Sequence, residues 1–228
     1  MSEQFFSVPG GADVSGALSL AFELHGTRHS YPQGVSVVRQ GEDVAAVSRI
    51  ASGLAKCVSA GPDGSETIIA LRGPGWLIGA TNALLRTKSP VSVITASPCT
   101  VVTLTRQVFE GLIGSDLDLP SSLLAVQAAE IEDLTTRYGE LASGSSRARL
   151  IKILRILLSV DLHARPGPAR VRLQIPVKEW ELAQLVAITP AHLCRLFGAL
   201  ERDKVLRRNK GWLEILDPQM IFNDGKRE

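Results

Sequence analysis

Short apolar runs separated by turn residues fill the first half of the sequence. Six runs rich in Val, Ile and Thr follow one another between residues 35 and 105, with clusters of Gly, Pro, Asp and Ser between them. Many short strands at close spacing, with no long helix among them, are typical of an antiparallel sandwich or a rolled barrel. The predicted strands cover residues 35–39, 44–50, 55–60, 66–72, 91–96 and 100–105.

The pattern changes to a helical period after this β-rich part. Thr105 is a good N-cap for a short helix over residues 106–113. Asp118, followed by Leu119-Pro120, predicts the start of a longer helix, because Asp favours the N-cap and Pro favours the first turn. That helix is expected over residues 119–142. At 1.5 Å per residue it spans about 36 Å, which is more than a small β domain needs.

Large side chains recur every seven positions on one face of the long helix. Heptad spacing is typical of helices that pair, so we expect this helix to join two copies of the chain in a homodimer. A helix that packs only on its own sheet is the alternative. Gln127 is the polar position of the seam and serves either as a register device or as a ligand contact. The predicted seam consists of Leu124, Gln127, Ile131, Leu134, Tyr138 and Leu141.

A break at Gly144-Ser145-Ser146 separates the long helix from the rest of the chain. An amphipathic helix follows over residues 147–163, and a Pro- and Gly-rich loop over 164–169. The break is the natural domain boundary. The predicted domains are residues 1–118, 119–143 and 144–228.

Two short helices and a basic hairpin are predicted between residues 175 and 217. The first helix covers 177–187 and is expected to bury Trp180. Thr189 as N-cap and Pro190 at the first helical position begin the second helix, which ends near residue 203. Strands over 205–208 and 212–216 flank a turn with basic residues at and beside it. Helix, tight turn, helix and basic hairpin form a winged helix-turn-helix.

The second helix of such a motif enters the major groove of DNA with its N-terminal residues facing the base edges. Arg195 can make the bidentate contact to guanine, although a surface arginine is the alternative reading. Arg207 and Arg208 alternate on a strand, so we expect one of them to face the phosphates. The predicted DNA-binding residues are Lys178, Thr189, Pro190, Ala191, His192, Arg195, Arg207, Arg208 and Lys210.

The charge distribution agrees with a nucleic-acid partner for the C-terminal part. Residues 1–144 carry 9 basic and 14 acidic residues, whereas residues 145–228 carry 16 basic and 9 acidic ones. The net charge of the whole chain is only +2, but its C-terminal part is basic. An apolar fraction of 45 % excludes a disordered chain. The three cysteines form no C-x-x-C pair, which argues against a disulfide scaffold and a zinc ribbon.

The sequence contains no catalytic signature that we recognise. G-x-S-x-G, a Walker loop, H-E-x-x-H and a G-x-G-x-x-G after a strand are all absent, and the four histidines are scattered. We therefore predict no catalytic residues, no metal site and no enzyme activity. No signal peptide and no membrane-length apolar run is recognised either, so a cytoplasmic protein without a membrane partner is expected.

A series of motifs resembles one family along some 180 residues. The motifs are QGE (40–42), I-x-SG-x-x-K (50–56), DG (63–64), GPGWLIG (73–79), LTRQVFEGLI (104–113), TP-x-x-L-x-R-L-x-x-x-L-E-R-D (189–203) and LEILDP (213–218). Their order resembles the Crp/Fnr family of bacterial transcription regulators. The resemblance implies an α+β fold with an N-terminal antiparallel, jelly-roll-like β-roll, a long central dimerisation helix and a C-terminal winged helix-turn-helix. It also implies a homodimer that reads a pseudo-palindrome in double-stranded DNA, and leaves a contact with RNA polymerase open.

The resemblance further implies an effector pocket between β-roll and central helix. The candidate pocket residues are Gly79, Ala80, Thr81, Asn82, Lys88, Ser89 and Gln127. In cAMP-binding members a Glu holds the ribose and an Arg-Ser pair holds the cyclic phosphate, but here Ala80 and Ser89-Pro90 stand at those positions. We therefore expect cAMP not to be the physiological ligand, or to bind weakly.

Two further departures affect sensing and DNA readout. Iron–sulfur members carry an N-terminal cysteine cluster, whereas the first cysteine here is Cys57, and the isolated His25 and His29 are more typical of surface residues than of haem ligands. The family's Arg-Glu pair at the start of the recognition helix is replaced by Pro190-Ala191. No cofactor is therefore predicted, an unknown small effector stays open, and the half-site should differ from the family's commonest one.

Three alternatives remain at this point. The chain is a ligand-responsive regulator, a regulator with a degenerate pocket that needs no effector, or a nucleotide- or small-ligand-binding regulatory protein. The basic C-terminal half argues against the last. Oxidation of Cys194 on the recognition helix is a further hypothesis for control of DNA binding.

Overall fold

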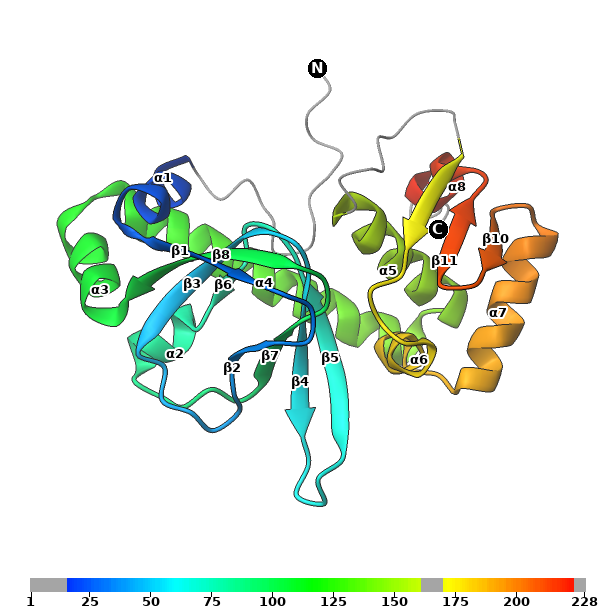
Figure 1. Ribbon diagram of the computed structural model, residues 1–228, viewed down its shortest axis with the longest axis horizontal. Coiled ribbons are helices and arrows are strands. Elements are labelled where there is room, and N and C mark those ends of the chain that lie inside the picture. Colours follow the sequence, from blue (N-terminus) through cyan, green and yellow to red (C-terminus); the bar gives the residue numbers. More distant parts are fainter. Residues whose placement is uncertain (1–15, 161–169, 224–228) are drawn as a thin grey trace. The chain divides into compact units, whose positions relative to one another are not determined.

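The computed structural model describes residues 16–160 and 170–223, and its mixture of sheets and helices is the predicted α+β class (Figure 1). The chain divides into two compact units between Thr135 and Thr136, a point that lies inside the long helix.

The first unit is a β-roll of two four-stranded antiparallel sheets. All six predicted strands are present within a few residues of their expected ends. One sheet has the order β1 (Thr27–Tyr31), β8 (Cys99–Thr105), β3 (Ala46–Ser52) and β6 (Leu77–Ile78). The other has the order β2 (Ser36–Val38), β7 (Ser92–Thr95), β4 (Ala55–Ala60) and β5 (Glu66–Arg72).

Helices cover one end of the roll and share a core with it. The rings of Phe22 and Phe109 lie 6.4 Å apart in that core, and both are fully buried. Thr105 caps its helix as predicted, because its hydroxyl accepts a hydrogen bond from the amide of Val108 at 3.3 Å. The helices are α1 (Gly16–His25), α2 (Ala80–Leu85), α3 (Arg106–Ser115) and α4 (Asp118–Ser143).

The long helix α4 begins one residue earlier than predicted and uses a different cap. Asp118 lies inside the helix, and the carboxylate of Asp116 accepts hydrogen bonds from the amides of Asp118 and Leu119 at 2.8 and 3.3 Å. The prediction of Asp118 as N-cap was therefore wrong by two residues. Asp116 and Asp118 are the same residue type two positions apart, and only the backbone geometry shows which of them caps the helix.

Two different faces run along α4. Leu119, Leu123 and Val126 are buried in the core of the β-roll. The five apolar residues of the predicted seam lie on another face and are exposed, from 43 % at Leu134 to 73 % at Tyr138, whereas Gln127 is half-buried. These apolar positions thus form a row of large side chains that the described residues do not cover.

The second unit contains a short three-stranded sheet and the remaining helices. The predicted break is confirmed, because α4 ends at Ser143 and the hydroxyl of Ser145 caps the next helix by accepting from the amide of Ala148 at 3.1 Å. The predicted loop at 164–169 and the last residues of the helix predicted over 147–163 lie outside the described residues. The helices are α5 (Ser146–Val160), α6 (Glu179–Val186), α7 (Pro190–Arg202) and α8 (Pro218–Asn223), and the sheet has the order β10 (Leu206–Asn209), β11 (Trp212–Ile215) and β9 (Val171–Gln174).

The described ranges contain no single helix that is long and apolar enough to cross a membrane. Helices α6 and α7 pass that test only when joined, and the chain bends by 89° between them.

Candidate nucleic-acid interface

Helices α6 and α7 form the predicted helix-turn-helix. Their near-perpendicular bend of 89° is produced by Ala187, which closes α6 in a left-handed conformation with φ of +55°. The amide of Ile188 returns to the carbonyl of Ala183 at 3.0 Å and tightens the turn. Leu182, Val186 and Leu193 are buried, which holds the two helices together. Trp180, predicted to point inward, is 44 % exposed, because the buried face of α6 carries Glu181 and Leu182 instead.

The N-terminus of α7 is capped as the sequence predicts. The hydroxyl of Thr189 accepts a hydrogen bond from the amide of His192 at 3.2 Å, and Pro190 occupies the first helical position. Pro has no amide proton, so it leaves no donor unsatisfied there. The Thr189 hydroxyl is therefore used by its own helix in this structure, and any phosphate contact at this end would involve backbone amides.

One face of α7 is buried and the opposite face is open. Leu193, Phe197 and Leu200 form the buried stripe. Ala191 and Arg195 are exposed on the other side. Within the described part of the chain the Arg195 guanidinium has no hydrogen-bonding or ionic partner, which leaves its planar fork of donors available.

His192 has a different environment from Arg195. Its ring Nε2 lies 3.3 Å from the hydroxyl of Ser146 at the start of α5, and the side chain is half-buried. The predicted outward residue thus also contacts the scaffold that supports α7. A second contact between the same helices is the ion pair of Arg147 with Asp203, at 2.8 Å.

The wing is the hairpin of β10 and β11. Lys210 is exposed at its turn, where Gly211 adopts a φ of +83°. Arg207 projects from the outer face of the sheet and lies 3.3 Å from the carboxylate of Glu214 on β11. Lys178, at the N-terminal end of α6, is also exposed.

Arg208 is tied to the recognition helix. The carboxylate of Glu201 on α7 accepts hydrogen bonds from the backbone amide of Arg208 at 2.9 Å and from its Nε at 3.3 Å. These contacts, with the backbone amide first, lower the pKa of Glu201. The Arg208 guanidinium also lies 5.6 Å from the ring centre of Phe197. Its charge is thus directed towards α7 and is partly neutralised there.

Sequence reasoning missed a basic residue on the outer face of the winged sheet. The Arg172 guanidinium lies 4.4 Å from the ring centre of Trp212, and register places Arg172 and Arg207 on either side of Glu214. Arg170 also lies near Glu214, at 3.6 Å. The missing signal was strand β9 itself, whose four residues VRLQ follow a Pro- and Gly-rich stretch and were not assigned to any element.

Cys194 is exposed on α7 and is not a core residue. Its thiol donates to the carboxylate of Glu179 at 3.1 Å, and this hydrogen bond raises the pKa of the Cys194 thiol. A higher pKa leaves less of the reactive thiolate at neutral pH, so the geometry does not favour a redox-active cysteine. Cys57 and Cys99 are buried in strands β4 and β8 of the β-roll.

The candidate effector residues lie in and around α2. Ala80 and Ser89 are buried, whereas Lys88 and Thr81 are exposed. Gly79 has a φ of +81°, and a Cβ there would meet the side chain of Val44 at 2.6 Å. The sharp turn into α2 therefore requires glycine at this position.

Polar groups of this segment are largely used by the segment itself. The Ser89 hydroxyl donates to the carbonyl of Val91 at 2.7 Å, and the Asn82 amide donates to the carbonyl of Lys88 at 3.0 Å. Gln127 on α4 donates to the hydroxyl of Thr81 at 2.9 Å. Thus Gln127 joins the central helix to the candidate pocket segment. Among the described residues no cluster of His, Cys, Asp or Glu could hold a metal ion.

Comparisons with known proteins cover both units. The model of the cyclic nucleotide-binding domain matches residues 28–116, and that of the Crp-like helix-turn-helix domain matches residues 148–221. The chain is 25 % identical over 194 residues to the Cyclic AMP receptor protein of Thermus thermophilus, which covers 85 % of this chain and 86 % of that protein. It is 21 % identical over 217 residues to a CRP-like cAMP-activated global transcriptional regulator of Mycobacterium tuberculosis, covering 95 % and 92 %.

Solved structures show the same fold. FixK2 from Bradyrhizobium japonicum has a TM-score of 0.72 at 16 % identity, over 87 % of this chain and 96 % of that chain. A c-di-GMP responsive global regulator of Xanthomonas campestris has a TM-score of 0.68 at 21 % identity, over 88 % and 99 %. The β-roll, the long helix and the winged helix-turn-helix occur here in the order of these regulators, and the chain belongs to the Crp/Fnr family of transcription regulators.

Proposed function

We propose that this regulator binds a pseudo-palindromic operator as a homodimer and does so without cAMP. Its Crp-like helix-turn-helix is a DNA-binding domain, and transcription regulators of this family are generally not enzymes. The dimer, the symmetry of the operator and the independence of cAMP are our inferences beyond membership of the family. We also infer which residues read the bases, and that the protein acts in the cytoplasm.

The exposed Arg195 on the capped end of α7 is the observation that carries the proposal. An unpaired guanidinium near the start of a recognition helix suits the O6 and N7 acceptors of guanine, a contact that discriminates bases by about 1–3 kcal/mol. Ala191 beside it suits the methyl group of thymine. Lys210 and Lys178 suit phosphates, because both are exposed.

The homodimer is supported by the exposed face of α4. Leu124, Ile131, Leu134, Tyr138 and Leu141 are all at least 43 % exposed and recur at heptad spacing. A row of large apolar side chains of this kind is covered most simply by the same row from a second copy. Two-fold symmetry then gives two half-sites about 34–36 Å apart.

Independence of cAMP is supported by the chemistry of the segment after Gly79. A ribose hydroxyl needs a buried acceptor, but Ala80 has none. A cyclic phosphate needs a charged fork, but Ser89 is followed by Pro90 and its hydroxyl is bonded to the carbonyl of Val91. Lys88 is exposed and offers only a point charge.

Selection of DNA from a random library by the purified full chain, without any added effector, tests the proposal. We expect an enriched pseudo-palindrome, whose information falls at one base pair of each half-site in Arg195→Ala. Salt-sensitive binding with no enriched sequence would instead favour a regulator that needs a small effector, and no binding at low salt would refute the DNA-binding role.

A calorimetric titration with cAMP tests the proposed independence of cAMP. We expect no measurable heat of binding at ligand concentrations that saturate a micromolar site. Micromolar affinity, or a cAMP-dependent gain in operator binding, would overturn the claim of independence and leave the DNA-binding role intact.

A further inference from the structure

The face of α4 that packs on the β-roll changes from apolar to charged along its length. Leu119, Leu123 and Val126 are buried, and the same face continues with Glu130 and Asp133 at spacings of four and three residues. The Asp133 side chain is only 6 % exposed and that of Glu130 only 23 %. Two carboxylates thus lie where the pattern of the face calls for leucine or valine.

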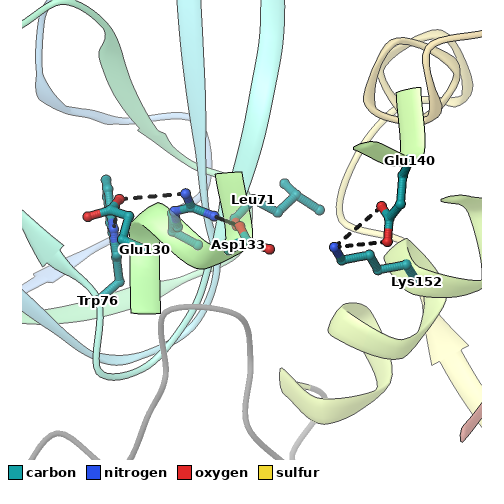
Figure 2. A network of polar contacts seen from close by, with 7 residues as sticks. Leu71, Trp76, Glu130, Asp133, Glu140 and Lys152 are labelled. Carbon is teal, nitrogen blue, oxygen red and sulfur yellow. Dashed lines mark hydrogen bonds and ion pairs between the residues drawn. The ribbon is translucent and has the colours of Figure 1, made fainter. Parts of the chain in front are cut away.

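Arg72 at the end of β5 forms ion pairs with both carboxylates, and its side chain is 6 % exposed. Figure 2 shows Glu130 and Asp133 on α4, with Trp76 beside Glu130. Its Nη1 lies 3.2 Å from Oδ2 of Asp133, and its Nη2 lies 3.6 Å from Oε1 of Glu130. Trp76 adds a third contact, because its indole Nε1 donates to Oε1 of Glu130 at 2.8 Å. We name these four residues the Arg72 clamp.

The clamp is a poor way to gain stability. Burying an ion pair removes both charges from water, and apolar residues of similar volume often stabilise a fold equally well or better. The Nε of Arg72 is also buried, and it has no hydrogen-bond partner within the described residues. The hydrogen bonds of the clamp are, however, directional: the Arg72 guanidinium donates to Asp133, and the Trp76 indole donates to Glu130.

The rotation of α4 about its own axis matters because the helix has a second face, which carries the predicted seam. Successive residues of an α-helix point about 100° apart, so fixing Glu130 and Asp133 against the sheet turns their neighbours Ile131 and Leu134 away from it. Those neighbours are 64 % and 43 % exposed, and both belong to the predicted seam. A purely apolar face could rotate or slide on the sheet at lower cost, and the seam would then turn with it.

We propose that Arg72 is a positioning residue that fixes the axial rotation of α4 and so presents the seam to a second copy without any bound ligand. Glu130 and Asp133 are its counterparts on the helix, and Trp76 orients Glu130. The link to the second copy rests on the proposed homodimer. The rotation of α4 on its own β-roll does not rest on it.

Hydrogen–deuterium exchange of the full chain tests the clamp independently of dimer formation. In Arg72→Gln we expect amides of residues 128–135 to exchange at least about tenfold faster than in the wild type, because the clamp no longer holds this part of the helix. Arg28→Gln is the matched control, since Arg28 also pairs with a glutamate of the first unit but is 57 % exposed. Equal exchange in the two variants would overturn the proposal.

A second variant separates positioning from stability. Arg72→Met combined with Glu130→Leu and Asp133→Leu replaces the clamp by apolar contacts and is expected to keep the wild-type unfolding midpoint. The readout is disulfide cross-linking between copies through Leu134→Cys or, as the off-seam probe, Glu132→Cys, each with Cys194→Ser.

With the clamp intact, we expect the seam probe to cross-link at least about tenfold faster than the off-seam probe, a difference that corresponds to about 1.4 kcal/mol. In the apolar variant this ratio should approach one. An unchanged ratio in a folded apolar variant would refute the positioning role. A wild-type chain that cross-links through neither probe would refute the proposed homodimer, and the exchange experiment would still decide the clamp.

Discussion

Arg208→Ala and Lys210→Ala are expected to affect DNA binding in different ways, although both remove a positive charge from the wing. Lys210 is exposed at the turn, whereas Arg208 bonds to Glu201 on the recognition helix and lies over Phe197. A charge already neutralised within the protein displaces few counterions when DNA binds. Only Lys210 should therefore contribute to the salt dependence of binding.

The size of each effect follows from these contacts. The slope of log K against log salt changes by about 0.9 for each phosphate contact, so Lys210→Ala in a dimer should flatten it by about 1.8. Arg208→Ala removes a pair in which the arginine is 39 % and the glutamate 31 % exposed. Solvent screening limits such a pair to about 0–1 kcal/mol, and the contact with the aromatic ring adds about 0.5–1 kcal/mol. The free energy of unfolding should fall by about 0.5–2 kcal/mol, with no change in the slope of log K against log salt.

Fluorescence anisotropy with one operator at several salt concentrations gives the slopes, and urea unfolding gives the stabilities. Glu201→Gln is the matched control, because it removes the partner of Arg208 and leaves the arginine in place. We expect Glu201→Gln to destabilise the chain by less than Arg208→Ala, because Arg208 keeps its contact with Phe197. The salt slope should become steeper, since the released guanidinium is free to bind a phosphate. If Arg208→Ala flattens the slope as much as Lys210→Ala, the reasoning is refuted and Arg208 leaves Glu201 on DNA.

Three further outcomes are expected. Ala187→Gly should raise the free energy of unfolding by about 0.5–1 kcal/mol, because Ala187 holds a φ of +55° that glycine adopts without strain. Urea titration measures this difference. A loss of stability would show that the methyl group of Ala187 makes stabilising contacts. The pKa of Glu201 is lowered in the folded chain, so Glu201 stabilises the fold above its ordinary pKa of 4.5, and this stabilisation is lost as the pH falls through the lower folded value. Glu201→Gln should abolish this part of the dependence of unfolding free energy on pH. An unaltered profile of unfolding free energy against pH would contradict the prediction. Glu179→Gln should lower the pKa of the Cys194 thiol and speed its alkylation by iodoacetamide at neutral pH, and an unchanged rate would show that the hydrogen bond does not control reactivity.

Six strands of the β-roll were predicted from their apolar residues, whereas α1, β6 and β9 were missed although each contains buried residues. Strands β4 and β5 were placed to the residue, because apolar residues between glycine-containing turns have few other structures open to them. Strand β1 was missed because its sequence, TRHSY, is polar and four of its five residues are exposed. It pairs with β8 along all five residues, and Tyr31 is its one partly buried side chain, so its hydrophobic signal is weak.

The helices and the hairpin of the candidate interface were predictable from the sequence, but the ion pairs between its side chains were not. Thr189 and Pro190 mark the start of α7 in the sequence because capping is local. Arg207 and Arg208 both look like phosphate contacts in the sequence, since their counterparts Glu214 and Glu201 are each seven residues away. Only the register of the hairpin and the position of β10 beside α7 show that both arginines have carboxylate partners.

The central helix shows why a heptad pattern alone is an incomplete argument. Spacing of seven identifies Leu124, Ile131 and Tyr138 as one row, but it does not say whether that row faces the sheet or the solvent. The structure decides this through the other face, where Leu123 and Val126 are buried and Arg72 binds the carboxylates further along. Because the β-roll satisfies both the apolar and the charged part of that face, the heptad row is left exposed among the described residues. A surface of this chemistry is costly to leave in water, and in the homodimer that we propose a second copy would cover it with an identical surface.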